Sequence, residues 1–146
     1  CLLVIRGCGP VGYPGSAEVV NMLPPDELIS AGTTSLPCIG DGRQSGTCAS
    51  PTILNASPES AVGGNLALLQ TNDIIQVDLN TCRVDALISD EELDARRKNH
   101  EPPKLENQTP WQEIYRGCVG QLNTGACLEP ATQYRDTCSK LPRHNH

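Results

Sequence analysis

Residues 7–15 contain four Gly and two Pro in nine positions, and this limits the structures that the start of the chain can adopt. Such a stretch cannot continue as a helix or a regular strand, because Gly adopts backbone conformations closed to other residues and Pro lacks an amide donor. The apolar segment before it, Leu2–Arg6, predicts a short strand. Ser16, directly after the loop, is a candidate N-cap for a helix predicted over residues 17–22.

A second glycine-rich loop covers residues 40–47, after a strand predicted over residues 35–39. It carries Asp41, Arg43, Ser45 and Thr47. Free backbone amides in such loops can bind an anion, for example a substrate carboxylate. In the first loop region, Glu18 offers the hard oxygen ligand that Mg²⁺ prefers. Ser45, beside Gly46, is a candidate base or nucleophile if its pKa is lowered.

A plainer interpretation treats both loops as tight turns only, with Ser16 as a helix cap and Arg43 paired to Asp41. Residues 44–46 lack the first Gly of a nucleophile elbow, and no His or Lys adjoins Ser45 in the sequence. From the residues alone, this plainer interpretation is favoured.

The rest of the chain predicts short elements and no βαβ repeat. We expect a mixed α/β fold with a small, partly antiparallel, barrel-like sheet flanked by short helices, in one domain over residues 1–146. Two capping boxes begin at Ser89 and Thr109. The expected elements are a helix over 24–32, a turn or helix from 57, a strand over 65–69, a hairpin over 74–79 and 82–88, helices to about 98 and 119, a linker over 99–109 and a helical tail over 110–146.

Composition narrows the classes of partner. The formal net charge is −6 and the sequence has no basic block, which disfavours binding to nucleic acid or to an anionic membrane surface. No apolar run approaches the roughly 20 residues of a membrane span. Aromatic residues make up 3 % and Phe is absent, so the core must be built from Leu, Ile, Val and Ala.

The eight cysteines are interpreted as free, mostly buried thiols. An even number in a short chain is compatible with a disulfide framework, but the spacings are irregular and no C-x-x-C motif occurs. Free thiols indicate a reducing compartment, the cytoplasm or alternatively the mitochondrion. Because the chain begins inside a predicted strand and without Met, we expect it to be a fragment or a processed product.

Four segments together resemble one family. Residues 9–18 resemble the G-P-x-G-x-P-G-M-x-E loop of the dihydroxy-acid dehydratase and 6-phosphogluconate dehydratase family, and residues 41–46 resemble its D-G-R-x-S-G loop. Residues 57–64 and 88–93 resemble its S-P-E-A-A-V-G-G and V-S-D-E-E-L segments. Residues 36–47, 109–114 and 142–146 look most similar to the sugar-acid branch, the arabinonate and xylonate dehydratases.

The resemblance implies the swivelling C-terminal domain of a dehydratase that turns a 2,3-dihydroxy acid into a 2-keto acid, with Mg²⁺ and an iron–sulfur cluster as cofactors. It implies that Ser45 is the base and Glu18 a Mg²⁺ ligand. The substrate-binding residues implied are Ser16, Gly46, Thr47 and His146. Ser16 stands where the family commonly has Met, and Cys48 and Ala49 stand where the branch usually has Ser-Gly.

The resemblance also implies partners. A missing N-terminal domain would supply the cluster cysteines and the other Mg²⁺ ligands, the substrate would be a sugar acid, and the protein would be a homo-oligomer. None of the eight cysteines lies in a cluster motif, so we assign no iron ligand and expect the isolated chain to be inactive. Two alternatives remain: a free-standing, non-catalytic domain that binds a small acid or a partner protein, and a free-standing enzyme with cluster-independent chemistry.

Overall fold

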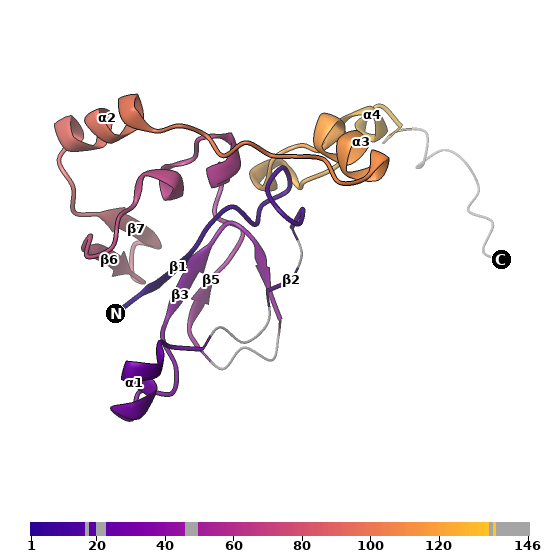
Figure 1. Cartoon of the computed structure of the whole chain (residues 1–146). Helices are drawn as coiled ribbons and strands as arrows, with labels where there is room; N and C mark the ends of the chain where they lie inside the picture. The colour runs from indigo at the N-terminus through magenta and orange to yellow at the C-terminus, as the bar shows by residue number, and fades with distance from the viewer. Residues whose placement is uncertain (17, 20–22, 46–49, 135, 137–146) are drawn as a thin grey trace.

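The computed structural model describes residues 1–16, 18–19, 23–45, 50–134 and 136 (Figure 1). Within them, three small open sheets combine with short helices. The mixed α/β class is therefore confirmed, but the described strands do not close into a barrel.

The central sheet is parallel and has the strand order β1-β3-β5. It consists of β1 (Leu3–Ile5), β3 (Cys38–Gly40) and β5 (Thr52–Ile53), with Cys38 opposite both Leu3 and Thr52. All three residues of β3 are buried, as expected for a strand with a neighbour on each side. The buried apolar residues that form the core are Leu36, Cys38, Ile39, Leu66, Leu68 and Val119.

A second, two-stranded sheet pairs β2 (Glu18–Val19) in parallel with β4 (Arg43–Gln44). The helix predicted over residues 17–22 is therefore wrong at residues 18–19. Ser16 has a φ of 58°, and its amide donates to the carbonyls of Cys8 and Gly9 at 3.1 and 3.0 Å. Ser16 thus closes the first loop, and pairing with the second loop overrides the local helical preference.

The predicted hairpin is confirmed as an antiparallel ribbon of β6 (Ile75–Asp78) and β7 (Arg83–Ala86). It supplies the antiparallel pairing in a sheet separate from the parallel one. The strand expected over residues 65–69 is instead a 3₁₀ helix, η2 (Asn65–Leu68). The Arg6 guanidinium donates to the carbonyls of Leu66, Ala67 and Leu69, which satisfies backbone groups that a strand would have directed to a neighbouring strand.

Both capping boxes begin helices as predicted. Ser89 Oγ and Thr109 Oγ1 each accept an amide hydrogen bond of 3.2 Å, from Glu92 and Gln112 respectively. They begin α2 (Asp90–Asn99) and α3 (Pro110–Cys118), with no helix or strand between. The remaining elements are α1 (Asp26–Ser30), η1 (Ser60–Val62), η3 (Leu122–Thr124) and α4 (Glu129–Thr132).

Figure 1 shows α2 and the β6–β7 hairpin on one side of the central sheet, and α3 and α4 on the other. The segment that connects α2 to α3 crosses the same end of the sheet as the first glycine-rich loop. No helix among the described residues is long and apolar enough to cross a membrane.

Six cysteines lie in the described part of the chain, and all six are free thiols, as predicted. The expectation that most are buried is wrong. Cys38 is buried, Cys8 and Cys118 are partly exposed, and the other three are exposed: Cys1, Cys82 and Cys127.

Candidate functional site

The two glycine-rich loops meet through the β2–β4 pairing. Glu18 lies opposite Arg43, and Val19 lies opposite Gln44. Adjacent strands are about 4.8 Å apart, and Ser45 follows Gln44 directly. The pairing therefore places Glu18, which is exposed, opposite Arg43, and Ser45, which is half-buried, follows directly after the end of β4.

Asp41 joins the start of the first loop to the second. Its side chain is fully buried and accepts hydrogen bonds from the amides of Gly7 and Cys8, both at 3.0 Å. It also accepts from the amide of Ser60 at 2.8 Å and from its hydroxyl at 2.5 Å. Hydrogen bonds to a charged acceptor are stronger than neutral ones, so Asp41 fixes the position of the loop relative to β3.

Glu59 holds the middle of the first loop in the same way. Its fully buried carboxylate accepts from the amides of Val11 and Gly12 at 2.9 and 3.0 Å. Nε2 of Gln121 donates a hydrogen bond of 2.8 Å to this carboxylate. Oε1 of Gln121 accepts a hydrogen bond of 3.1 Å from the main-chain amide of Glu59. Two buried carboxylates therefore bind the free amides of the loop.

Neither role was evident from the sequence. The sequence makes Asp41 a candidate partner for Arg43, and it places Glu59 in the family-like segment 57–64 without a role of its own. The glycine-rich loop itself could have indicated these roles. A buried loop with many free amides needs hydrogen-bond acceptors for them. Carboxylates adjoining Gly or Pro, as at Asp41 and Glu59, are suitable candidates for that role.

Arg43 does not pair with Asp41. Its Nε donates to the carbonyl of Ser16 at 2.7 Å, which links the end of the first loop to β4. Ser16 Oγ is buried and has no hydrogen-bond partner among the described residues. Ser16 is therefore not a helix cap, which removes the plainer interpretation of this residue.

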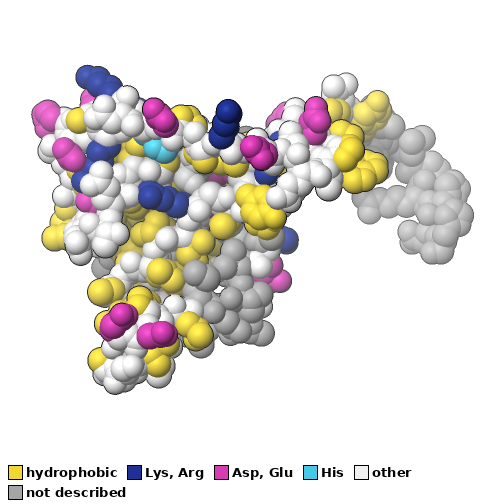
Figure 2. All heavy atoms as spheres, viewed as in Figure 1, with side chains coloured by type: hydrophobic (Ala, Val, Ile, Leu, Met, Phe, Trp, Pro, Cys, Tyr) yellow, Lys and Arg dark blue, Asp and Glu magenta, His cyan; other side chains and the backbone are white. Residues whose placement is uncertain are grey.

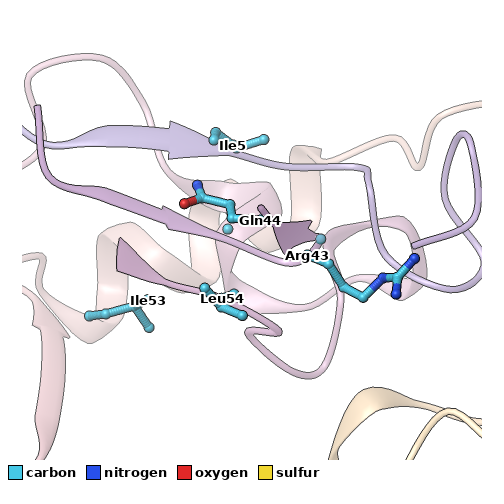
Figure 3. Close-up of a pocket in the computed structure, with 7 residues that line it drawn as sticks. Ile5, Arg43, Gln44, Ile53 and Leu54 are labelled. Carbon is cyan, nitrogen blue, oxygen red and sulfur yellow. The ribbon is translucent and has the colours of Figure 1, made fainter. Parts of the chain in front are cut away.

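Gln44 points away from Arg43, into the sheet. Figure 3 shows its side chain between Ile5 and the β5 end, where Ile53 and Leu54 lie, while Arg43 extends in the opposite direction. The void in this position is only about 10 Å³, too small for a substrate. Gln44 therefore contributes to packing, and Arg43 faces the loop side.

The pocket on the loop side is larger, about 430 Å³. Ser16 and Arg43 come from the two loops, Asn55 follows β5, and Tyr115 comes from α3. The remaining lining residues are Gly15, Leu122, Gly125 and Ala126. The guanidinium of Arg43 and the amide of Asn55 give this pocket polar groups that can bind a small anionic polyol.

Helix α3 supports the first loop from the other side of this pocket. Arg116 Nε donates to the Val11 carbonyl at 3.0 Å, and Nη2 reaches the Gly12 carbonyl at 3.5 Å. A Cβ on Gly15 would lie 3.4 Å from Cε1 of Tyr115, so the aromatic ring is close to the loop backbone. The sequence predicted α3 but gave no indication of these contacts.

The remaining predicted site residues divide into two groups. Gly46, Thr47 and His146 lie outside the described residues. As for metals, no group of three His, Cys, Asp or Glu in the described part of the chain could hold an ion. Glu18 therefore fits a Mg²⁺ site only as one ligand among others from outside these residues, and the described cysteines do not fit an iron–sulfur cluster.

The sequence model of the dihydroxy-acid/6-phosphogluconate dehydratase C-terminal family matches residues 1–126. The chain belongs to this family. It is 60 % identical over all 146 residues to D-xylonate dehydratase of Caulobacter vibrioides and covers 24 % of that protein.

Two further relatives have different names. L-Arabinonate dehydratase of Rhizobium leguminosarum bv. trifolii is 38 % identical over 129 residues, which are 88 % of this chain and 22 % of that protein. Dihydroxy-acid dehydratase of Clostridium beijerinckii is 40 % identical over 129 residues, 88 % of this chain and 23 % of that protein. The chain thus spans about a quarter of the length of these curated relatives.

Proposed function

We propose that residues 1–146 form the C-terminal part of a dehydratase that converts a 2,3-dihydroxy sugar acid, of the pentonate class, into a 2-keto-3-deoxy acid. The observation that carries the proposal is the pairing of Glu18 with Arg43, which unites the two family loops beside a pocket that Arg43 lines. The names of the xylonate and arabinonate relatives support the substrate class.

In this proposal the Ser45 alkoxide removes the proton from C2, and the hydroxide lost from C3 takes up a proton from the Ser45 hydroxyl so formed and leaves as water. The resulting enol becomes the 2-keto acid by proton transfer to C3. A serine hydroxyl serves as a base only when positive charge stabilises its alkoxide. Arg43, two residues away, contributes one positive charge on the pocket side.

Arg43 is also suited to orient the substrate. Its Nε is engaged by the Ser16 carbonyl, which fixes the plane of the guanidinium at the pocket wall. A fixed guanidinium presents its remaining donors to a carboxylate with defined geometry. We therefore assign Arg43 to the substrate carboxylate and Asn55 to its hydroxyl groups. Ser16 lines the same pocket and is proposed as a further substrate contact, as the family resemblance implies.

Glu18 would hold Mg²⁺ together with ligands from the rest of the full-length protein. A bound Mg²⁺ supplies positive charge that lowers the pKa of nearby hydroxyl groups. The iron–sulfur cluster that the family resemblance implies would be held entirely outside the described residues. The cytoplasmic location and the homo-oligomeric state remain predictions.

The proposal is tested in a chimera in which this chain replaces the segment that it matches in the Caulobacter D-xylonate dehydratase. The chimera should convert a pentonate to a 2-keto acid. Ser45→Ala should lower kcat by about 10²–10⁴-fold, the usual contribution of a general base, while iron and magnesium content stay unchanged.

Ser35→Ala, at an exposed position outside both loops, is the matched control and should retain full activity. An unmodified chimera without turnover, or full turnover by Ser45→Ala, would contradict the proposal.

A further inference from the structure

Helix α3 carries an apolar face that the described residues do not cover. Trp111 is 78 % exposed and Ile114 is 56 % exposed. With Tyr115 and Cys118 they occupy positions i, i+3, i+4 and i+7, one face of a helix, and no residue of α3 is buried. We call Trp111 and Ile114 the α3 face.

Further exposed apolar side chains follow the helix in the sequence. Leu128 and Tyr134 are 44 % and 61 % exposed, and an isolated bridge between Val119 and Leu128 joins the end of α3 to this segment. Figure 2 shows hydrophobic side chains gathered on the part of the molecule formed by α3 and α4. A contiguous patch of large apolar side chains marks an interaction surface more often than an isolated exposed residue does.

The length of the relatives indicates what covers this face. The chain spans 24 % of the D-xylonate dehydratase to which it aligns along its whole length, so about three quarters of a protein of that size lies outside it. The site needs completion from there, since Glu18, opposite the pocket residue Arg43, belongs to no group of three among the described residues that could hold a metal ion. Tyr115, Gly125 and Ala126 line that pocket, so the α3 face adjoins the place where the added body must come.

We propose that the α3 face is the docking surface for the preceding part of the same polypeptide in the full-length protein. The inference rests on the proposed function in one respect, that the chain works as part of a longer dehydratase. Helix α3 then has two roles: Trp111 and Ile114 bind the preceding part, and Arg116 holds the carbonyls of Val11 and Gly12. Docking therefore stabilises the loop that leads to Ser16 and Glu18.

Hydroxyl-radical footprinting with peptide mass spectrometry tests the docking without relying on activity. Trp111 is the only Trp of the chain, and its oxidation is compared between the 146-residue chain and the D-xylonate dehydratase chimera. We expect Trp111 to lose most of its oxidation in the chimera. Leu79, which is 82 % exposed at the β6–β7 turn, is the internal control and should be oxidised equally in both.

A second variant pair separates docking from folding of α3. In the chimera, Trp111→Asp with Ile114→Asp should increase oxidation of Leu128 and Tyr134, because a charged face cannot bury against an apolar partner. Glu113→Lys, exposed on the same helix, should leave their oxidation unchanged. Equal oxidation in both variants would overturn the docking.

Other partners of the α3 face would give different patterns of Trp111 oxidation. Protection of Trp111 in the isolated chain that rises with protein concentration would assign the α3 face to a second copy and overturn the proposal. So would undiminished Trp111 oxidation in the chimera. An active chimera with an exposed Trp111 would leave the proposed function intact while removing this docking surface, so the two failures are distinguishable.

Discussion

The carboxylate of Glu59 accepts the main-chain amide of Gly12 at 3.0 Å across 47 residues of sequence. The same carboxylate binds the Val11 amide and the Gln121 side chain, and its side chain has no exposed surface. One buried charge therefore joins the first glycine-rich loop, the start of η1 and the C-terminal region. Loop geometry at the candidate site depends on this acceptor.

Replacing Glu59 tests that dependence. Glu59→Gln puts an NH₂ donor where the structure needs an acceptor, so at least one buried amide loses its partner. We expect the free energy of unfolding to fall by about 2–3 kcal/mol, the usual cost of leaving buried donors unpaired beside a lost charged acceptor. Urea denaturation measures the change. Glu113→Gln, at an exposed position of α3, should change stability by less than about 0.5 kcal/mol; equal effects would refute the role of Glu59.

Local signals account for the elements that the sequence predicted correctly. The Ser89 and Thr109 capping boxes need only residues three positions apart, and the β6–β7 ribbon needs a short turn between two alternating segments. The contacting residues are close in sequence, so a pattern within a short window is enough to predict these elements. The pairing of Glu18 with Arg43, across 25 positions, left no such pattern, and residues 17–22 were assigned to a helix.

The site was predictable only in part. The family motifs placed Ser45 and Glu18 in two loops, and β2–β4 pairing brings those loops together. The buried roles of Asp41 and Glu59 depend on which amides remain free after folding, and the contacts of Arg116 depend on how α3 packs against the first loop. Neither is encoded in a local pattern.

Cys8 offers a prediction on thiol reactivity. Burial, and secondarily the negative charge of Asp41, raise the pKa of the Cys8 thiol above its ordinary value. Because the thiolate is the reactive form, Cys8 should be alkylated by iodoacetamide at pH 8 more slowly than Cys127, which is exposed. Peptide mass spectrometry of the native chain over a time course measures both rates. Equal rates, with the chain folded, would contradict the prediction.

The pair of Asp73 and Arg96 should make stability depend on pH. Arg96 donates to both oxygens of Asp73, at 2.6 and 3.1 Å, and this hydrogen bonding, followed by that of the Gln70 amide, lowers the pKa of Asp73. A lowered carboxyl pKa in the folded state stabilises the protein above the unfolded value, about 3.9, and this contribution is lost as pH falls through the folded pKa.

Asp73→Asn removes that titration. The difference in unfolding free energy between the original chain and the variant should be largest near neutral pH and should shrink below about pH 4. Urea denaturation at several pH values between 3 and 7 measures it. Asp94→Asn is the control, since Asp94 is 66 % exposed in its pair with Arg97 and such pairs contribute little. A difference for Asp73→Asn that does not vary with pH would exclude this linkage.

The isolated chain should not dehydrate sugar acids, although it contains the family serine. An unassisted hydroxyl is a very weak acid, and a general base works best when its pKa lies near the working pH. A bound metal ion can lower the pKa of a hydroxyl group by the amount required. Water bound to a metal, for example, has its pKa lowered from 15.7 to about 7. The described residues offer Glu18 as a ligand but no group of three that could hold an ion, and the charge of Arg43 alone is not sufficient.

The 146-residue chain is incubated with Mg²⁺ and several pentonates, and formation of 2-keto acid is followed with the D-xylonate dehydratase chimera as the positive control. We expect product from the chimera and none from the chain, and sustained turnover by the chain alone would instead identify a free-standing enzyme with cluster-independent chemistry.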